Sequence, residues 1–422
     1  MRVSIGIWRA SREQICFLDS CGVIYEKIER ESEFDAFSHI FLFDKASKIL
    51  FKENRTVIDF TRKTGKKFVG SFMLFDEQTD IFSFVADLSL ITSIPMDLTK
   101  KSTVLRKGFH ISQKKLPSEE VPFRDKGGLQ RLFISALIKL FHSQGLPLSL
   151  KSFSPDPEKT VFLFRVDTDF SDRETIENYY ENIKNPPEIS WFVHCNVFEK
   201  TDGLFSAGDN DEFALHCFSH KVKPAKENLE KAIRILKERG KKPLGFAAPY
   251  GVRSEGNDIF LKQNYGFEYS SDFSFAADAL PFFVEKTGLW QIPIFPLCVG
   301  SFNGVSGDEN KITEVFERYF ARQFRYKIPF VLYDHPNHKK FDLLNEILKK
   351  AGEYPILPMT FLQYSRFLEE RRNASSSFPL ITFYPDESMP QKFAPIKKIS
   401  RFSPRLIKNT IIGRLRRRKY DS

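Results

Sequence analysis

The second half of the chain alternates between strand-like and helix-like segments, and this alternation restricts the possible folds more than any other feature. Such an order is typical of an α/β fold with parallel strands. In α/β barrels the site lies at the carboxyl ends of the strands, so we expect functional residues where each strand ends. The predicted strands are Val161–Val166, Ser190–Val197, Glu212–Leu215, Gly245–Ala248 and Pro329–Tyr333.

The length of 422 residues exceeds what one hydrophobic core usually spans, so more than one domain is expected. Apolar residues at helical spacing predict a connecting helix over Leu129–His142. In the first domain the predicted strands are Val3–Trp8, His39–Phe43, Thr56–Phe60, Phe68–Phe75 and Ile81–Ala86. We expect a small α/β domain at 1–125, a connecting helix and linker at 126–159, a catalytic domain at 160–372, and a linker with a basic tail at 373–422.

The net charge of +10 is concentrated at the end of the chain. Residues 392–422 contain eleven Lys and Arg and one acidic residue, so the rest of the chain is neutral. After Ser403-Pro404 the tail combines a narrow apolar stripe with many basic residues. This pattern fits a helix on an anionic membrane surface or a disordered basic tail. Nucleic-acid binding is not expected, because few aromatic residues accompany the charge.

The chain shows no apolar stretch of the kind that forms an export signal near its start, where Arg9 and Arg12 follow within a few residues. Its five cysteines form no C-x-x-C pair and are odd in number, which fits reduced thiols. We therefore expect a cytoplasmic protein, peripheral to the inner face of the membrane if the tail binds there.

Three predicted strands end in residues that can bind a metal. Asp167 and Asp169 follow the first, His216 and His220 the third, and His335 the last. Histidines at i and i+4 project to the same side of a helical turn, where both can reach one ion. Unrelated histidines and a helix-capping acidic pair remain the alternative. Two imidazoles with one carboxylate leave coordination positions open, as in catalytic sites.

Together these segments resemble the polysaccharide deacetylase family, whose catalytic module is the NodB homology domain, over roughly residues 160–371. The Asp-x-Asp pair is similar to the family's first motif in a spaced variant found in deacetylases and deformylases of lipopolysaccharide assembly. The other similar segments are Ser190-Trp-Phe-Val193, His216-Cys-Phe-Ser-His220, Phe246-Ala-Ala-Pro-Tyr-Gly251, Tyr265-Gly-Phe-Glu-Tyr-Ser-Ser-Asp272 and Leu332-Tyr-Asp-His335. The resemblance implies a deformed (β/α) barrel that hydrolyses N-acyl sugars.

The resemblance also implies a role for each motif residue. One aspartate, His216 and His220 would bind a divalent ion, with zinc expected, and the other aspartate would act as general base. We favour Asp169 as the ligand and Asp167 as the base. The backbone N–H of Tyr250 would stabilise the oxyanion. His335 would protonate the departing amine, oriented by Asp272 or, less securely, by Asp334.

One departure concerns the motif arginine, which pairs with the catalytic aspartate in the family. Ala247 stands in its place, and Arg253 or Arg165 are candidate substitutes. Hydrolysis of an acetyl or formyl group is the favoured prediction, and a catalytically inactive carbohydrate-binding protein is the alternative. A nucleotide-linked or lipid-linked sugar of cell-surface polysaccharide or lipopolysaccharide synthesis is the expected substrate, because no export signal is evident.

Overall fold

The computed structural model describes residues 4–44, 56–59, 104–105, 120–121, 126–201, 203–221, 223–272, 280–294, 298–300, 308–374 and 378–385. The predicted strands Phe68–Phe75 and Ile81–Ala86 and the basic tail lie outside these residues. Within them, no helix is long and apolar enough to cross a membrane.

A small parallel sheet forms the first unit, in the order β2-β1-β3-β4. The helix between its first two strands begins at a capping box in which Ser11 and Gln14 satisfy each other's backbone N–H groups. The elements are β1 (Ile5–Trp8), α1 (Arg12–Ser20), β2 (Glu26–Ile28), the 3-10 turn η1 (Glu31–Ala36), β3 (His39–Leu42) and β4 (Thr56–Asp59). The described part of the first domain is therefore α/β, as predicted.

A curved sheet of nine strands forms the second half, in the order β13-β14-β12-β11-β10-β9-β8-β15 with β16 also paired to β8. All pairings are parallel except that of β13 with β14. The strands are β8 (Thr160–Asp167), β9 (Ile189–His194), β10 (Glu212–Cys217), β11 (Gly245–Phe246), β12 (Tyr269–Ser270), β13 (Phe282–Val284), β14 (Leu289–Gln291), β15 (Phe330–Asp334) and β16 (Ile356–Met359). This arrangement confirms the predicted α/β fold, a deformed (β/α) barrel in the second half of the chain.

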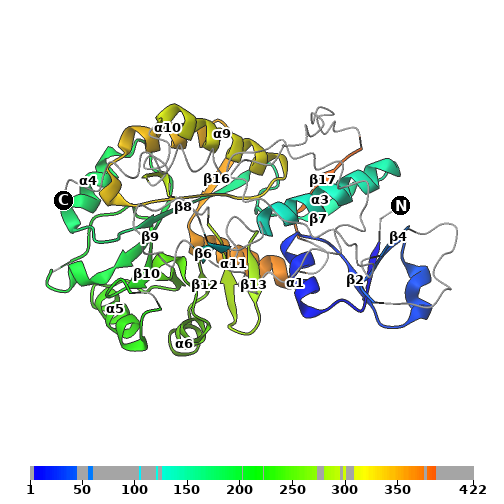
Figure 1. Cartoon of the computed structure of the whole chain (residues 1–422), viewed down its shortest axis with the longest axis horizontal. Helices are drawn as coiled ribbons and strands as arrows, with labels where there is room; N and C mark the ends of the chain where they lie inside the picture. Colours follow the sequence, from blue (N-terminus) through cyan, green and yellow to red (C-terminus); the bar gives the residue numbers. More distant parts are fainter. Residues whose placement is uncertain are drawn as a thin grey trace.

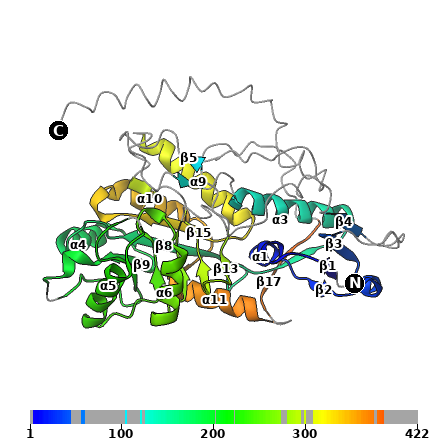
Figure 2. The same ribbon diagram turned by 60° about the horizontal axis from the view of Figure 1, so that its bottom comes forward.

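Helices cover the outside of this sheet, and one helix packs on its inner face (Figures 1 and 2). The outer helices are α4 (Arg173–Asn182), α5 (Lys226–Glu238), α6 (Glu255–Tyr265), α9 (Glu309–Arg325) and α10 (Phe341–Ala351), and α11 (Phe361–Asn373) packs inside. The predicted connecting helix is α3 (Lys126–Ser143), and short segments are β5 (Val104–Leu105), β6 (Glu120–Val121), η5 (Cys195–Phe198), η6 (Pro249–Gly251) and η7 (Pro336–His338).

Strand β8 shows how the sheet positions functional residues. All eight of its residues are buried, as expected for a parallel strand covered on both faces. Phe162, Phe164 and Val166 join the outer core under the helices, while Val161 and Leu163 join the inner core. Because side chains alternate along a strand, Asp167 belongs to the inner face at the carboxyl end.

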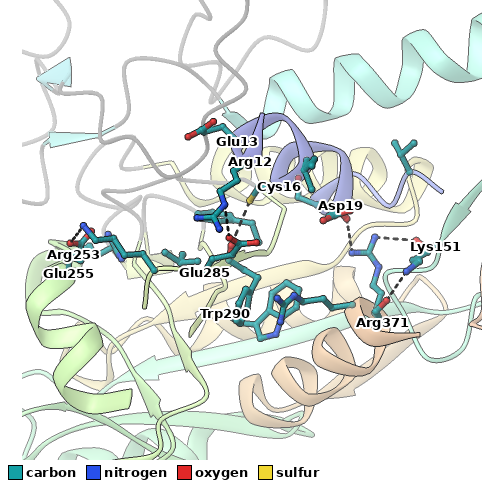
Figure 3. A pocket seen from close by; sticks show the side chains of 18 residues that line it. Arg12, Glu13, Cys16, Asp19, Lys151, Arg253, Glu255, Glu285, Trp290 and Arg371 are labelled. Atoms are coloured by element: carbon teal, nitrogen blue, oxygen red, sulfur yellow. Dashed lines mark hydrogen bonds and ion pairs between the residues drawn. The ribbon is translucent and has the colours of Figure 1, made fainter. Parts of the chain in front are cut away.

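The two halves of the molecule share one hydrophobic core. It contains Phe17 of α1, Phe133 of α3 and Phe282 of β13, together with β7 (Leu148–Lys151) and β17 (Leu380–Phe383). The last two strands pair antiparallel, so residues predicted as linker are part of the folded structure. Beside this core lies a cavity of about 280 Å³ between α1, the β13–β14 edge and Arg371 (Figure 3).

A buried carboxylate ties several elements of the barrel together. Glu212 of β10 accepts hydrogen bonds from the Ser190 hydroxyl at 2.8 Å, the Tyr269 hydroxyl at 2.7 Å and the Leu362 N–H at 2.9 Å. These donors belong to β9, β12 and α11. The side chain therefore fixes the inner helix against strands β9, β10 and β12.

We expect Glu212→Ala to lower the free energy of unfolding by about 3 kcal/mol or more, because buried donors left without an acceptor cost roughly 1–3 kcal/mol each. Chemical denaturation measures this loss. Glu346→Ala, which removes an exposed partner of Lys349, is the control and should change stability by less than about 0.5 kcal/mol. Equal effects of the two substitutions would contradict this assignment.

Candidate metal centre

Asp169, His216 and His220 meet at the carboxyl ends of β8 and β10. His216 Nε2 lies 2.9 Å from Asp169 Oδ1, and His220 Nε2 lies 3.2 Å from Asp169 Oδ2. One ligand atom from each of the three residues lies within 4.8 Å of the others. Two imidazoles and one carboxylate are a donor set that binds zinc and related divalent ions.

Within the described residues, the atoms that face one another here lack other hydrogen-bond partners. Asp169 Oδ1, His216 Nε2 and His220 Nε2 are all buried and make no hydrogen bond of acceptable geometry there. Buried polar atoms are rarely left in this state, because each loses its hydration without replacement. The residues present therefore fit a divalent ion.

A backbone carbonyl fixes the ring of His216. Its Nδ1 lies 2.7 Å from the Ala247 carbonyl oxygen, which can only accept, so Nδ1 carries a hydrogen and, when the ring is neutral, Nε2 is the nitrogen with the lone pair. This outer contact is typical of metal-binding histidines. Ala247 thus contributes to the centre through its backbone, although its side chain cannot replace the arginine.

The two histidines are not on a helical turn, and that expectation was wrong. Strand β10 continues through His216 to Cys217, with a register shift between Leu215 and Cys217, and His220 follows in an irregular loop. Asn228 of α5 holds this loop: its Oδ1 accepts from the Phe218 and Ser219 N–H groups, and its Nδ2 donates to the Ser219 carbonyl. A bulged strand end and a clamped loop bring the two rings together.

Burial and neighbouring charges oppose each other at these groups. Burial favours the neutral form of Asp169, but the adjacent His216 and the other histidines hold the pKa of Asp169 well below its usual value. Burial likewise disfavours the charged form of His216, but the Asp169 carboxylate raises its pKa. Electrostatic attraction therefore dominates desolvation at the centre.

The second carboxylate of the motif pairs with Arg165. Asp167 Oδ1 lies 2.5 Å from Arg165 Nε, and Asp167 Oδ2 lies 2.6 Å from Nη2, which makes a bidentate pair. Arg165 is 1% exposed, and its Nη1 donates to the Ser271 carbonyl at 2.6 Å. Of the two candidate substitutes for the motif arginine, Arg165 is therefore the one that contacts Asp167. Arg253 instead pairs with Asp258 of α6 at 2.7 Å.

His335 lies beside the centre, but the expected orienting aspartates do not hold it. Its Nε2 is 3.5 Å from Asp169 Oδ2. Asp272 accepts from the Ala248 N–H and the Ser270 hydroxyl instead, so its predicted contact with His335 is wrong. Asp334 accepts from the Tyr179 hydroxyl of α4 and the Gly300 N–H, and faces His338. Both carboxylates are engaged by other groups.

Tyr250 lies against one of the two histidines. Its ring centroid is 4.4 Å from that of His220. Its backbone has φ of 59° and ψ of 15°, a left-handed conformation that costs energy in a residue other than glycine. The preceding Pro249 and the following Gly251 frame this strained turn, which holds the tyrosine against the histidine pair.

The sequence prediction omitted two residues of the centre, His194 and Phe170. His194 Nδ1 accepts the Phe170 N–H at 3.1 Å, and burial together with the charge of His216 lowers the pKa of His194 to about 4, so the ring is neutral near pH 7. Phe170 has a positive φ of 54° and is 64% exposed. His194 lies at the end of strand β9, and this position is the sequence signal that could have identified it.

Comparison with known proteins finds likeness only among solved structures, since no protein-family model and no curated protein matches the chain. A protein from Mycobacterium smegmatis described as a polysaccharide deacetylase is 17% identical, with a TM-score of 0.39; the match covers 54% of this chain and 96% of that one.

Two further solved structures are similar over half of this chain. The peptidoglycan deacetylase PdaC from Bacillus subtilis is 14% identical, with a TM-score of 0.31 and coverage of 51% of this chain and 95% of that one. A pseudoenzyme of the CE4 family from Bacillus anthracis is 12% identical, with a TM-score of 0.32 and coverage of 50% and 66%. Similarity this low does not indicate a function, so the function of this chain has to be inferred from the residues of its site.

We expect Arg165→Gln to lower the free energy of unfolding by about 3–5 kcal/mol, because it leaves the Asp167 charge buried without its partner. Arg366→Gln is the matched control: Arg366 makes a bidentate pair with Glu268 at 3.0 Å on the surface, worth about 1 kcal/mol or less. Denaturant titration compares the two. A loss for Arg165→Gln no larger than that for the control would show that the buried pair does not stabilise the barrel.

Proposed function

We propose that the chain is a metal-dependent hydrolase that removes an N-acyl group, acetyl or formyl, from a sugar. The observation that carries this proposal is the convergence of Asp169, His216 and His220 beside a separate, arginine-paired carboxylate. Three ligands leave coordination positions open for a reactant. A divalent ion held there, with zinc expected, supplies Lewis acidity that polarises an acyl carbonyl and acidifies water.

Asp167 fits the role of general base. Its bidentate contacts with Arg165 fix the plane of the carboxylate and balance its charge, while each oxygen keeps a further lone pair. Asp169 faces the histidines and is the ligand in this assignment. Asp167 and Asp169 thereby have different roles, because Asp167 faces a guanidinium and Asp169 faces imidazoles.

The leaving amine needs a proton, and His335 is a further imidazole beside the ligand set. Its Nε2 faces Asp169, so a proton held on this nitrogen is directed toward the centre. The Tyr250 N–H is assigned to the oxyanion, by resemblance and by the position of the tyrosine against His220.

Phe170 is the proposed contact for the sugar ring. Exposed large apolar side chains beside a polar centre commonly mark binding surfaces, and Phe170 directly follows the metal ligand Asp169. Its ring is 5.2 Å from that of His220. A nucleotide-linked or lipid-linked sugar of surface-polysaccharide or lipopolysaccharide synthesis would present its N-acyl group to the ion while its ring lies on this phenyl face.

Zinc-loaded full-length protein should release acetate or formate from at least one N-acylated sugar nucleotide or lipid-linked sugar, and a chelator should stop the release. Asp167→Asn should keep bound metal and lose about 10²–10⁴-fold in turnover, since a general base contributes that much. Asp169→Asn should lose the metal itself. Metal analysis and coupled acetate or formate assays measure both effects.

Two results would overturn this assignment. Metal loss in Asp167→Asn but not in Asp169→Asn would reverse the two roles. Binding of N-acyl sugars without any release by the zinc-loaded protein would instead support an inactive carbohydrate-binding protein.

We expect Phe170→Ala to raise KM about 2–10-fold with a smaller change in kcat, because an aromatic contact is worth roughly 0.5–1.5 kcal/mol beyond its buried area. Phe170→Tyr keeps the ring and should restore KM. The exposed Tyr384, replaced by Ala, is the control and should leave KM unchanged. A fall in kcat alone would contradict a substrate contact.

A further inference from the structure

A second cluster of metal-binding side chains lies next to the first. Cys298, Asp334, His335 and His338 each offer a ligand atom, and these atoms lie within 4.8 Å of one another. Asp334 ends β15, His335 and His338 flank η7, and Cys298 follows the segment after β14. The proposed hydrolysis uses His335 of this cluster and neither Cys298 nor His338.

The separations within the cluster match those of ligands around one ion. His338 Nδ1 lies 3.6 Å from Cys298 Sγ and 3.5 Å from Asp334 Oδ1. Tetrahedral zinc with its usual bond lengths places sulfur and nitrogen ligands about 3.5 Å apart, and nitrogen and oxygen ligands about 3.4 Å apart. Both separations from His338 Nδ1 therefore match the spacing of ligands around one zinc ion.

A cysteine-histidine-aspartate hydrolytic triad built on His338 does not fit these residues. In such a triad the thiol and the carboxylate contact different nitrogens of the imidazole, so that a proton can be relayed through the ring. Here both Cys298 and Asp334 face Nδ1 of His338. Two anionic ligands converging on one nitrogen are arranged around a shared cation instead.

The surroundings hold these side chains in place. Asp334 is 1% exposed and accepts from the Tyr179 hydroxyl at 3.3 Å and from the Gly300 N–H at 3.1 Å. Gly300 also provides space, because a Cβ there would clash with the His338 ring. Cys298 is likewise 1% exposed, whereas the His338 side chain is 31% exposed and leaves the cluster open to solvent. An ion can therefore enter from the side of His338.

His335 supplies the fourth donor. Its Nε2 faces Asp169, while its Nδ1 is buried and makes no hydrogen bond of acceptable geometry within the described residues. Its ring centroid is 5.0 Å from that of His338. A buried nitrogen without a partner carries a desolvation cost that a ligand would remove.

We propose that Cys298, Asp334 and His338, with His335 as the fourth ligand, bind a second divalent ion, and that this ion is zinc. A thiolate with two imidazoles and one carboxylate gives zinc its preferred tetrahedral N/S/O environment, and a thiolate disfavours magnesium and calcium. The inference goes beyond the proposed hydrolysis and does not depend on it.

Cobalt(II) separates the two sites, because it commonly replaces zinc and gives a near-ultraviolet charge-transfer band when a thiolate is a ligand. The cluster of Asp169, His216 and His220 contains no sulfur ligand. Metal-free full-length protein, kept reduced with a phosphine rather than a thiol, should bind two equivalents of cobalt. The charge-transfer band should grow as one of the two cobalt equivalents binds.

Cys298→Ser should abolish the band and lower the stoichiometry by one equivalent. His216→Ala should also remove one equivalent but keep the band, and Cys16→Ser, at a half-buried cysteine outside both clusters, should behave like the wild type. Failure of the proposed function would appear separately, as two bound equivalents without hydrolysis.

Alkylation of the wild-type protein tests the site without any substitution that could disturb folding. Bound zinc should protect Cys298 from modification, as read by mass spectrometry of its peptide. The absence of a thiolate band, a band that persists in Cys298→Ser, or equal alkylation of Cys298 with and without zinc would each overturn the second site.

Discussion

The buried ion pair between Arg165 and Asp167 is the interaction on which the rest of the site depends. Burying two charges costs several kcal/mol per ion, so such a pair persists only where its hydrogen-bonding groups are satisfied. Here the guanidinium donates to Asp167 and to Ser271, and it stacks over the Phe192 ring at 4.6 Å. The pair thereby joins β8, β9 and the end of β12, and it fixes the inner face from which Asp169 follows.

Much of this arrangement follows from local sequence. The apolar run before Asp167 predicts a buried strand, and the period of two places Arg165 and Asp167 on the same face. That parity favours Arg165 over Arg253 as the partner of Asp167, although sequence analysis left both open. The helical reading of His216 and His220 failed because spacing of i and i+4 also suits a bulged strand end followed by a loop. The deciding contact comes from Asn228, on the next helix.

Other parts of the site could not be predicted, because they depend on contacts between distant segments. Cys298 is isolated in the sequence, and nothing near it marks a site until the fold brings it against His338. Asp272 has the motif position of an orienting aspartate, yet its carboxylate is used by Ala248 and Ser270. Motif position shows where a strand ends, whereas hydrogen-bond partners show what a side chain can still do.

His335 connects the two metal clusters, because its ring has to be held in one orientation. A proton donor must keep one nitrogen directed at the reacting group, so the other nitrogen has to be held. Asp272 and Asp334 accept hydrogen bonds from other groups, and His335 Nδ1 is buried and makes no hydrogen bond of acceptable geometry within the described residues. An ion on Cys298, Asp334 and His338 would bind this nitrogen and keep Nε2 toward Asp169. In the proposed mechanism, the second site would orient His335 as Arg165 orients Asp167.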